Sequence, residues 1–458
     1  MINPHTGNPS TVNPTSADIR ALISHGPISA FQFVMLAVCV GLNMLDGFDV
    51  LVMSFTASDV SAEWKLTGSE LGLLLSAGLV GMAAGSLFLA PRADRIGRRA
   101  IILICVIIVS IGMLLSGFCR SVVQLGVLRV VTGIGIGGIL ASATVMVAEF
   151  SSARWRSTAS CLYTSGYSIG GTAGGAVAAL LIARYGWRSA FQFGALASAI
   201  MLPLVYWGLP ETVDYLVTRR PLDALSRLNL LLKRMRRATL VTLPAAMLHE
   251  HAPAGPAVWR LLSTPLVRST TLIWIAFFFM MAGYYFVFSW TPRLLTVSGL
   301  TAAQGITSGV LLSLGGIFGT VLFAFVAATT EIRRLTCLSL LVASVLMVLF
   351  ALTLTNLDLT RILGVLLGGV ATGAMAGFYA LTPILYQPDT RATGMGSAIG
   401  IGRLGAILAP IGTGKLIDLG WHPMQLYLVF ASVFLVAMLG LLGLAAPVAA
   451  PMLAREAA

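Results

Sequence analysis

Residues 94–99 read Asp-Arg-Ile-Gly-Arg-Arg, a short charged segment between two long apolar stretches. The stretches on either side, near 68–91 and 100–119, are long enough to cross a bilayer as helices, which takes about 20 apolar residues each. The glycine inside the charged segment permits a tight turn. The pattern predicts two membrane-spanning helices joined by a polar loop.

Ten further apolar stretches continue this pattern in both directions along the chain. The candidate spans lie near 31–57, 68–91, 100–119, 121–148, 158–183, 187–208, 268–290, 304–328, 335–356, 362–386, 394–417 and 424–448. We therefore predict an all-α integral membrane protein of twelve transmembrane helices in two six-helix halves. Its parts would be a tail (1–30), a first half (31–208), a central loop (209–267), a second half (268–448) and a second tail (449–458).

Composition excludes a soluble globular protein. Hydrophobic residues make up 57% of the chain and charged residues only 10%, whereas soluble domains carry about a quarter charged residues. Residues 1–30 lack the apolar core of a cleaved signal peptide, so we expect the first span to start insertion. The five cysteines are scattered without metal-ligand spacing, and His249 and His251 form only a weak candidate site. We expect no metal and no cofactor.

The distribution of lysine and arginine predicts the orientation. Twenty of the 29 basic residues lie in the two tails, the central loop and the loops on the same side, and seven lie in the opposite loops. Because positive charge stays on the cytoplasmic side, both tails and the central loop are expected to be cytoplasmic. The net charge of +12 is then an orientation signal, and we expect no nucleic-acid partner.

The central loop contains apolar residues at helical spacing with basic residues between them. The apolar positions are Leu222, Leu225, Leu228, Leu232 and Met235. This pattern predicts a basic amphipathic helix lying on the anionic inner leaflet. A partner-binding helix is the alternative.

Two carboxylates interrupt the first span. Asp46 and Asp49 are three residues apart and share one helix face, and each costs about 2.5–3.5 kcal/mol at a helix centre. Two like charges repel, which favours a bound proton on one of them. We predict that both take part in proton coupling; the alternative is a structural ion pair with Arg129 of span four or with another arginine.

Two arginines are the candidates for holding an anionic substrate. Arg403 lies about 18 Å along its helix from Arg391, near the middle of the membrane, and Arg129 lies inside span four. A guanidinium binds a carboxylate through two parallel hydrogen bonds. The apolar stretches of the second half contain no acidic residue, so a protein partner of Arg403 would have to come from elsewhere.

Aromatic residues gather in spans five, seven and ten. They are Tyr163, Tyr167, Phe277, Phe278, Phe279, Tyr284, Tyr285, Phe286, Phe288, Trp290, Phe378 and Tyr379. Some of these rings would stack on a planar substrate, and we choose Tyr284, Phe378 and Tyr163. Trp290 is expected in the interfacial belt.

Several motifs carry a family resemblance. The segment 94–99, the pattern Arg129-xxx-Gly133-x-Gly135-x-Gly137 and Leu209-Pro210-Glu211, with twelve spans divided six and six, resemble the major facilitator superfamily. Two positions of the usual loop motif are replaced, by Ala90 and Arg92, and its counterpart in the second half is reduced to 331–334. Asp46-Gly47-Phe48-Asp49 together with 400–407 resembles the aromatic acid:proton symporters.

The resemblance implies proton-coupled uptake of small aromatic carboxylates across a bacterial inner membrane, by a monomer that is no enzyme. Hydroxybenzoates, benzoate and chlorinated phenoxyacetates such as 2,4-D are the candidate cargoes. The residues that match those used by the family are Asp46, Asp49, Arg129, Glu149, Arg391 and Arg403. Asp94, Arg98, Glu149, Arg156 and Arg391 are expected to form the gate.

Two alternatives remain open. The first is a proton-driven exporter of drugs or metabolites with the same fold. Such antiporters usually carry a Gly-Pro turn in span five, and residues 166–172 contain no proline. The second is a membrane enzyme or receptor, which is not favoured because the spans contain no nucleophile–base pair and no metal cluster.

Overall fold

The computed structural model describes residues 29–152, 155–237, 239–243, 261–262, 266–354, 356–387 and 390–444. The regular structure of these residues is helical, and twelve of their helices are long and apolar enough to cross a membrane. The predicted fold class is confirmed. The weak His249–His251 site and both tails lie outside the described residues.

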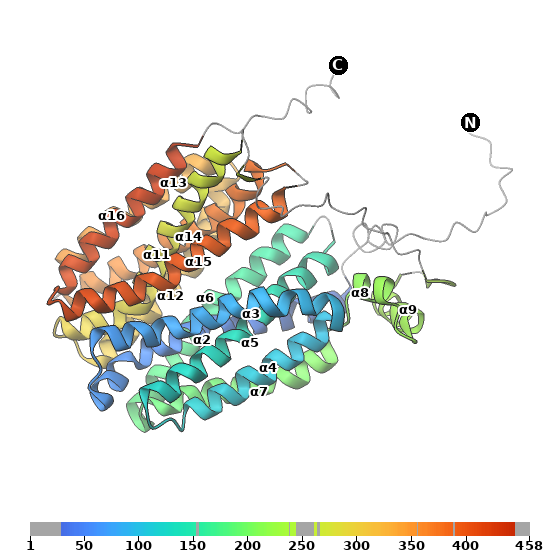
Figure 1. Cartoon of the computed structure of the whole chain (residues 1–458), viewed down its shortest axis with the longest axis horizontal. Coiled ribbons are helices and arrows are strands. Elements are labelled where there is room, and N and C mark those ends of the chain that lie inside the picture. Colours follow the sequence, from blue (N-terminus) through green and yellow to red (C-terminus); the bar gives the residue numbers. More distant parts are fainter. Residues whose placement is uncertain are drawn as a thin grey trace, which may run out of the picture.

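The twelve spans form two sets separated by the central loop (Figure 1). The first set is α2 (Ala30–Trp64), α3 (Gly68–Ile96), α4 (Arg98–Ser116), α5 (Val122–Phe150), α6 (Arg156–Tyr185) and α7 (Arg188–Gly208). The second set is α11 (Val267–Val297), α12 (Ala302–Ala327), α13 (Ile332–Leu352), α14 (Leu357–Leu381), α15 (Arg391–Asp418) and α16 (Pro423–Leu442). A 3₁₀ turn, η1 (Thr382–Leu385), follows α14.

The helix starts follow local capping chemistry. Ser29, Thr67 and Thr301 each accept a hydrogen bond from a backbone N–H of the first turn and form a capping box with the residue three positions on. Such caps satisfy backbone donors that a helix start leaves unpaired. α2 and α11 extend past the apolar stretches predicted for them, and protein covers the added turns in part.

The two sets pack in the same pattern. In the first half α2 packs on α6, α3 on α5 and α4 on α7; in the second, α11 packs on α15, α12 on α14 and α13 on α16. These are the same pairs counted from the start of each half. The two six-helix halves predicted from the sequence therefore share one helix arrangement.

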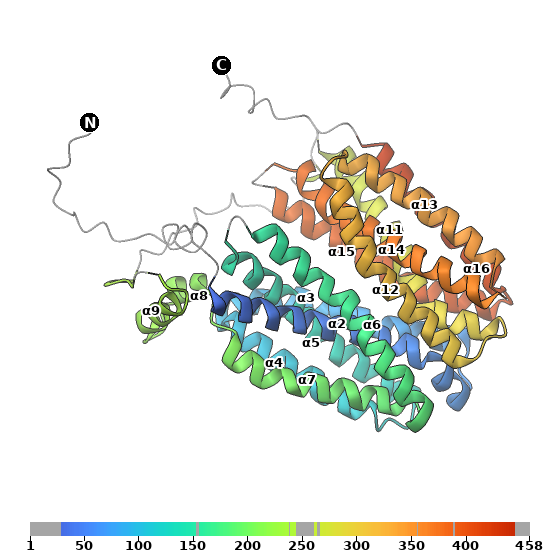
Figure 2. The same ribbon diagram turned by 180° about the vertical axis from the view of Figure 1, so that it is seen from behind.

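The halves meet through α3 on α15, α6 on α12 and α2 on α11. We call the end of the bundle near α8 (Val213–Arg219) and α9 (Ala224–Arg234) the loop end, and the other the opposite end (Figures 1 and 2). Within the described residues, every hydrogen bond between the halves lies between mid-bundle and the opposite end. They join Ser54 to Phe288 and Ser289, Ser58 to Thr296, Ser76 to Ile407, and Gly68 and Ser69 to Asp418. The molecule is thus closed at the opposite end.

The central loop differs from the prediction in one respect. The amphipathic helix exists as α9, but Leu228, Leu232 and Met235 are buried inside the protein. Arg234 also packs over the ring of Phe31 in α2. Protein covers these three positions, whereas Leu222 is fully exposed. Contact of the helix with the inner leaflet stays a prediction.

Candidate functional site

A close crossing of α2 and α6 fixes the first site carboxylate. A Cβ on Gly47 would lie 1.9 Å from the carbonyl oxygen of Tyr167, and one on Gly170 would lie 2.0 Å from that of Met44. Only glycine permits this approach at either position. The glycine between Asp46 and Asp49 therefore locks the middle of α2 against α6.

Asp49 and Arg129 form a buried ion pair. The guanidinium donates to both carboxylate oxygens, with Nη1–Oδ1 at 2.7 Å and Nη2–Oδ2 at 2.9 Å, and Nη2 also donates to the Asp49 carbonyl at 2.6 Å. The side chains are 1% and 2% exposed. Because these two groups are ion-paired with each other, the structure does not support a substrate contact by Arg129 or proton transfer by Asp49.

Replacing Asp49 by asparagine is expected to destabilise the protein strongly. The change leaves the Arg129 charge buried without a counterion, which costs about 3–5 kcal/mol. Thermal unfolding of the purified protein in detergent would show the loss, and Arg129→Met in the same chain should restore part of it. Asp59→Asn is the control, since Asp59 lies on the same helix and forms no ion pair within the described residues. Equal melting temperatures for the two asparagine variants would contradict the assignment.

Asp46 differs from Asp49 although both lie on one face of α2. Its side chain is 4% exposed, and its Oδ1 atom is buried with no hydrogen-bond partner. A buried carboxylate oxygen without a partner is costly. Asp46 is therefore the carboxylate of this pair that remains available for a proton or a ligand.

Arg403 supplies the charge that faces Asp46 from the other half. The two groups interact electrostatically, but no ion pair within 4 Å joins them. The Arg403 side chain is half-buried near the middle of α15 and forms no ion pair or hydrogen bond with other described residues. A Cβ added to Gly396 or Gly400, on the same side of α15, would meet nothing within 4 Å. The guanidinium thus lies beside open space.

Three tyrosines complete what we call the central cluster: Asp46, Arg403, Tyr167, Tyr285 and Tyr379. Each tyrosine interacts electrostatically with both Asp46 and Arg403. The cluster draws on α2 and α6 of one half and α11, α14 and α15 of the other. Charged groups and hydroxyls from both halves therefore converge where the halves meet, which is where transporters with repeated halves bind their cargo.

The predicted aromatic contacts have mixed outcomes. Tyr284 and Tyr163 are buried near Asp46, and Tyr284 stacks on Phe288 with ring centroids 4.4 Å apart. Phe378 is 0% exposed and packs edge-on against Phe277. In this conformation Phe378 packs between helices, and its role as a ring contact stays a prediction.

The location of Trp290 differs from the one predicted from the sequence. Its side chain is 1% exposed, and its indole N–H donates to the carbonyl of Pro410. The interfacial belt predicted for this residue is contradicted, because the tryptophan joins α11 to α15 inside the second half.

Comparison with known proteins agrees with this geometry. The sequence model described as Major Facilitator Superfamily matches residues 36–410. The chain belongs to the major facilitator superfamily. It is a multi-pass membrane transporter and no enzyme, as expected.

Its relatives narrow the family further. The gallate transporter of Pseudomonas putida is 32% identical over 88% of this chain and 89% of that protein. The 4-hydroxybenzoate transporter PcaK of Pseudomonas aeruginosa is 30% identical over 88% and 90%. The predicted membership among the aromatic acid:proton symporters and the location in a bacterial inner membrane are thereby confirmed.

Solved structures confirm the fold alone. The inward-open xylose transporter XylE from E. coli superposes with a TM-score of 0.71 at 18% identity, covering 93% of this chain and 99% of that one. A bacterial homologue of the lysosomal transporter Spinster, inward-facing and occupied, gives 0.67 at 19% identity over 89% and 95%.

At the loop end of this facilitator, none of the predicted gate charges pairs across the two halves within the described residues. Arg98 at the start of α4 pairs with Asp94 near the end of α3 at 2.7 Å. Glu149 accepts from the backbone N–H groups of Val213 and Asp214 at the start of α8. Arg156 and Arg391 are exposed and form no ion pair with other described residues. The loop-end charges therefore do not join the halves in this conformation.

Glu211 is a loop-end residue that the sequence marked only as part of a motif. Its carboxylate accepts from the backbone N–H groups of Arg98 and Arg99, capping α4 beside Gly97, whose φ is +108°. Burial raises the pKa of this carboxyl above its ordinary value, partly offset by the backbone hydrogen bonds. The cap ties the 94–99 loop to the end of the sixth span.

Asp418 is a site residue that the sequence did not single out. From the end of α15 it accepts from the backbone N–H groups of Gly68 and Ser69 at 2.6 and 2.8 Å, and from the Ser69 hydroxyl at 2.5 Å. The carboxylate thus caps α3 across the interface between halves, where the positive end of the helix dipole favours a negative charge. It holds the opposite end closed.

Removing this charge is expected to populate the state open at the opposite end. With spin labels on Ala62→Cys and Met424→Cys, Asp418→Asn should raise the long-distance population several-fold in pulsed electron resonance. Asp358→Asn is the control, because Asp358 lies at the same end and contacts only Arg361 of its own half. Identical distance distributions for Asp418→Asn and the parent chain would contradict the assignment.

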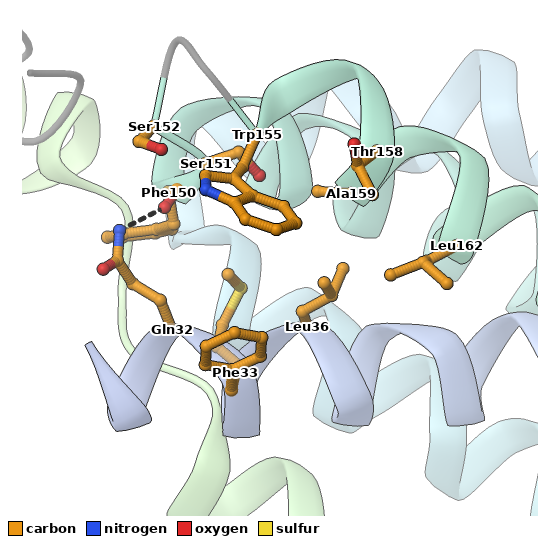
Figure 3. Close-up of a pocket in the computed structure, with 11 residues that line it drawn as sticks. Gln32, Phe33, Leu36, Phe150, Ser151, Ser152, Trp155, Thr158, Ala159 and Leu162 are labelled. Carbon is orange, nitrogen blue, oxygen red and sulfur yellow. Dashed lines mark hydrogen bonds between the residues drawn. The ribbon is translucent and has the colours of Figure 1, made fainter. Parts of the chain in front are cut away.

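One pocket lies away from the central cluster, at the loop end between α2, α5 and α6 (Figure 3). Phe33, Leu36, Trp155 and Leu162 give it an apolar lining. Gln32 at its edge donates to the carbonyl of Phe150 at 2.7 Å. None of the predicted substrate or proton residues lines it.

Proposed function

We propose that this chain is a symporter that imports a small aromatic carboxylate together with protons. The observation that carries the proposal is the central cluster. Arg403 lies near the middle of its helix and has no ion-pair partner among the described residues, and Asp46 from the other half interacts with it electrostatically. Ionisable groups at membrane depth are costly and mark transport pathways.

In this scheme Arg403 grips the substrate carboxylate. A guanidinium offers two parallel donors that match a carboxylate, and the bond strengthens where water is excluded. The open space beside Gly396 and Gly400 leaves room for the ligand. Tyr284 and Tyr163 are the rings we propose beside the substrate.

Asp46 carries the proton in the same scheme. A negative Asp46 repels an anionic substrate held at Arg403, and a neutral Asp46 does not. Binding of the anion and of a proton therefore favour each other. Inward proton movement then offsets the cost of bringing an anion into a negative cytoplasm.

The loop end is assigned to the cytoplasm, because the lysine and arginine excess lies there. The structure is then the inward-facing state, with Asp418 closing the outer end. In the outward-facing state the loop end would close, and we propose that Asp94, Arg98, Glu149, Arg156 and Arg391 form its gate contacts. One half rocking against the other would alternate the two states.

For the cargo, the relatives named for gallate and 4-hydroxybenzoate support a benzoate-type acid. Another relative is named a benzoate transport protein, from Acinetobacter baylyi, at 26% identity. Chlorinated phenoxyacetates such as 2,4-D share the ring and the carboxylate and stay within the proposal as a narrower prediction.

Uptake into proteoliposomes tests the proposal. Labelled benzoate, 4-hydroxybenzoate, gallate and 2,4-D are offered to vesicles of the purified protein, with and without an inward-directed proton gradient. Accumulation of at least one acid above its external level, only with the gradient, is the expected result. Accumulation without a gradient, or transport of none of the four, would overturn the proposal, and gradient-driven efflux alone would favour the exporter.

A further inference from the structure

The scheme above leaves the hydroxyl of Tyr167 in the central cluster without a role. This atom is buried and has no hydrogen-bond partner. Tyr285 lies next to it, and the two hydroxyls interact weakly, but their contact does not have the geometry that would satisfy the buried Tyr167 hydroxyl. A buried hydroxyl that stays unpaired is unfavourable, so a native protein that keeps one usually has a use for it.

The position of Tyr167 is fixed by the packing described above. Its backbone carbonyl lies against Gly47, the residue after Asp46, at a distance that excludes any side chain there. The hydroxyl also interacts electrostatically with both Asp46 and Arg403. Tyr167 is thus held rigidly at the place where a substrate bound to Arg403 would lie.

We propose that the Tyr167 hydroxyl determines specificity by hydrogen-bonding a ring hydroxyl of the substrate, so that phenolic acids bind better than unsubstituted benzoate. This inference rests on the proposed function. In the proposed scheme the guanidinium of Arg403 donates both hydrogen bonds to the carboxylate of the substrate. The remaining polar group of a phenolic acid is its ring hydroxyl, which donates and accepts as the tyrosine hydroxyl does.

The physical basis of the selectivity is the cost of leaving Tyr167 unpaired. A phenolic acid supplies the missing hydrogen bond, whereas bound benzoate leaves the tyrosine hydroxyl buried without a partner. Sites built to hydrogen-bond a substrate hydroxyl discriminate against the analogue that lacks it for this reason. Tyr167→Phe removes both the hydrogen bond to a phenolic acid and the unpaired hydroxyl that benzoate leaves. The variant should therefore lose the preference for phenolic acids while keeping the ring in place.

The test is competition for uptake of labelled 4-hydroxybenzoate in proteoliposomes. In the unmodified chain, unlabelled 4-hydroxybenzoate should compete at about tenfold lower concentration than benzoate, the effect of one buried hydrogen bond. In Tyr167→Phe the two acids should compete equally. Tyr185→Phe is the matched control, since Tyr185 is exposed at the end of the same helix, and it should keep the preference.

The outcomes separate this inference from the function on which it rests. Uptake of none of the acids overturns both. Uptake with an unchanged competition ratio in Tyr167→Phe overturns the role of Tyr167 alone. An equal loss for both acids also overturns it, because that result would mean that Tyr167 contacts the carboxylate common to the two.

Discussion

Arg403→Ala is expected to lower the uptake of a benzoate-type acid by about 100-fold at low substrate concentration. Each hydrogen bond to a charged group contributes about 1.5–3 kcal/mol, and a bidentate carboxylate contact has two of them. Every 1.4 kcal/mol is about tenfold in affinity. Initial rates of uptake into proteoliposomes, at substrate levels below KM, measure the loss.

Two further variants show whether the effect belongs to the guanidinium fork. Arg403→Lys keeps the charge but not the paired donors, so we expect an intermediate loss. Lys415→Ala removes an exposed cation from the same helix, α15, and should leave uptake near the level of the unmodified chain. If Arg403→Ala transports as well as Lys415→Ala, the substrate carboxylate is bound elsewhere.

Asp46→Asn is expected to separate transport from the proton gradient. The asparagine has no proton to exchange, so the variant should lose accumulation against a gradient. It should still exchange labelled internal substrate for unlabelled external substrate, because that exchange needs only binding and rocking of the halves. Gradient-driven uptake and counterflow in the same vesicles measure the two activities.

Asp59→Asn is the matched control for this experiment. It makes the same chemical change on the same helix, two turns or more away from the central cluster, and both activities should survive. Gradient-driven accumulation by Asp46→Asn would mean that another group carries the proton. Loss of counterflow with a folded protein would mean that Asp46 binds the substrate directly.

The sequence predicts the fold well because membrane burial imposes a simple rule. A span needs about 20 apolar residues, and the twelve stretches that meet this need all became helices. Arg403 and Asp46 were also predictable, since charges in a span are costly and stand out. In both cases the prediction needs only the type of one residue or the composition of one stretch, and no contact between distant residues.

Contacts between residues that are far apart in the chain could not be predicted from the sequence. Asp46 and Asp49 look alike in the sequence, and only the approach of Arg129 from α5 makes one a structural group and leaves the other open. Asp418 lies about 350 positions from the helix start that it caps. Which aromatic rings face open space depends on helix rotation, which neighbouring helices set, so the sequence does not show that Phe378 packs against Phe277.

The dependence of substrate binding on pH, in the chain with and without Asp46, tests the central claim most directly. Binding of labelled 4-hydroxybenzoate to the purified protein is measured between about pH 6 and 8, where the substrate carboxyl stays ionised. If a proton on Asp46 and an anion on Arg403 favour each other, binding to the unmodified chain tightens as pH falls, and binding to Asp46→Asn does not change. The same pH dependence in both proteins would contradict the account.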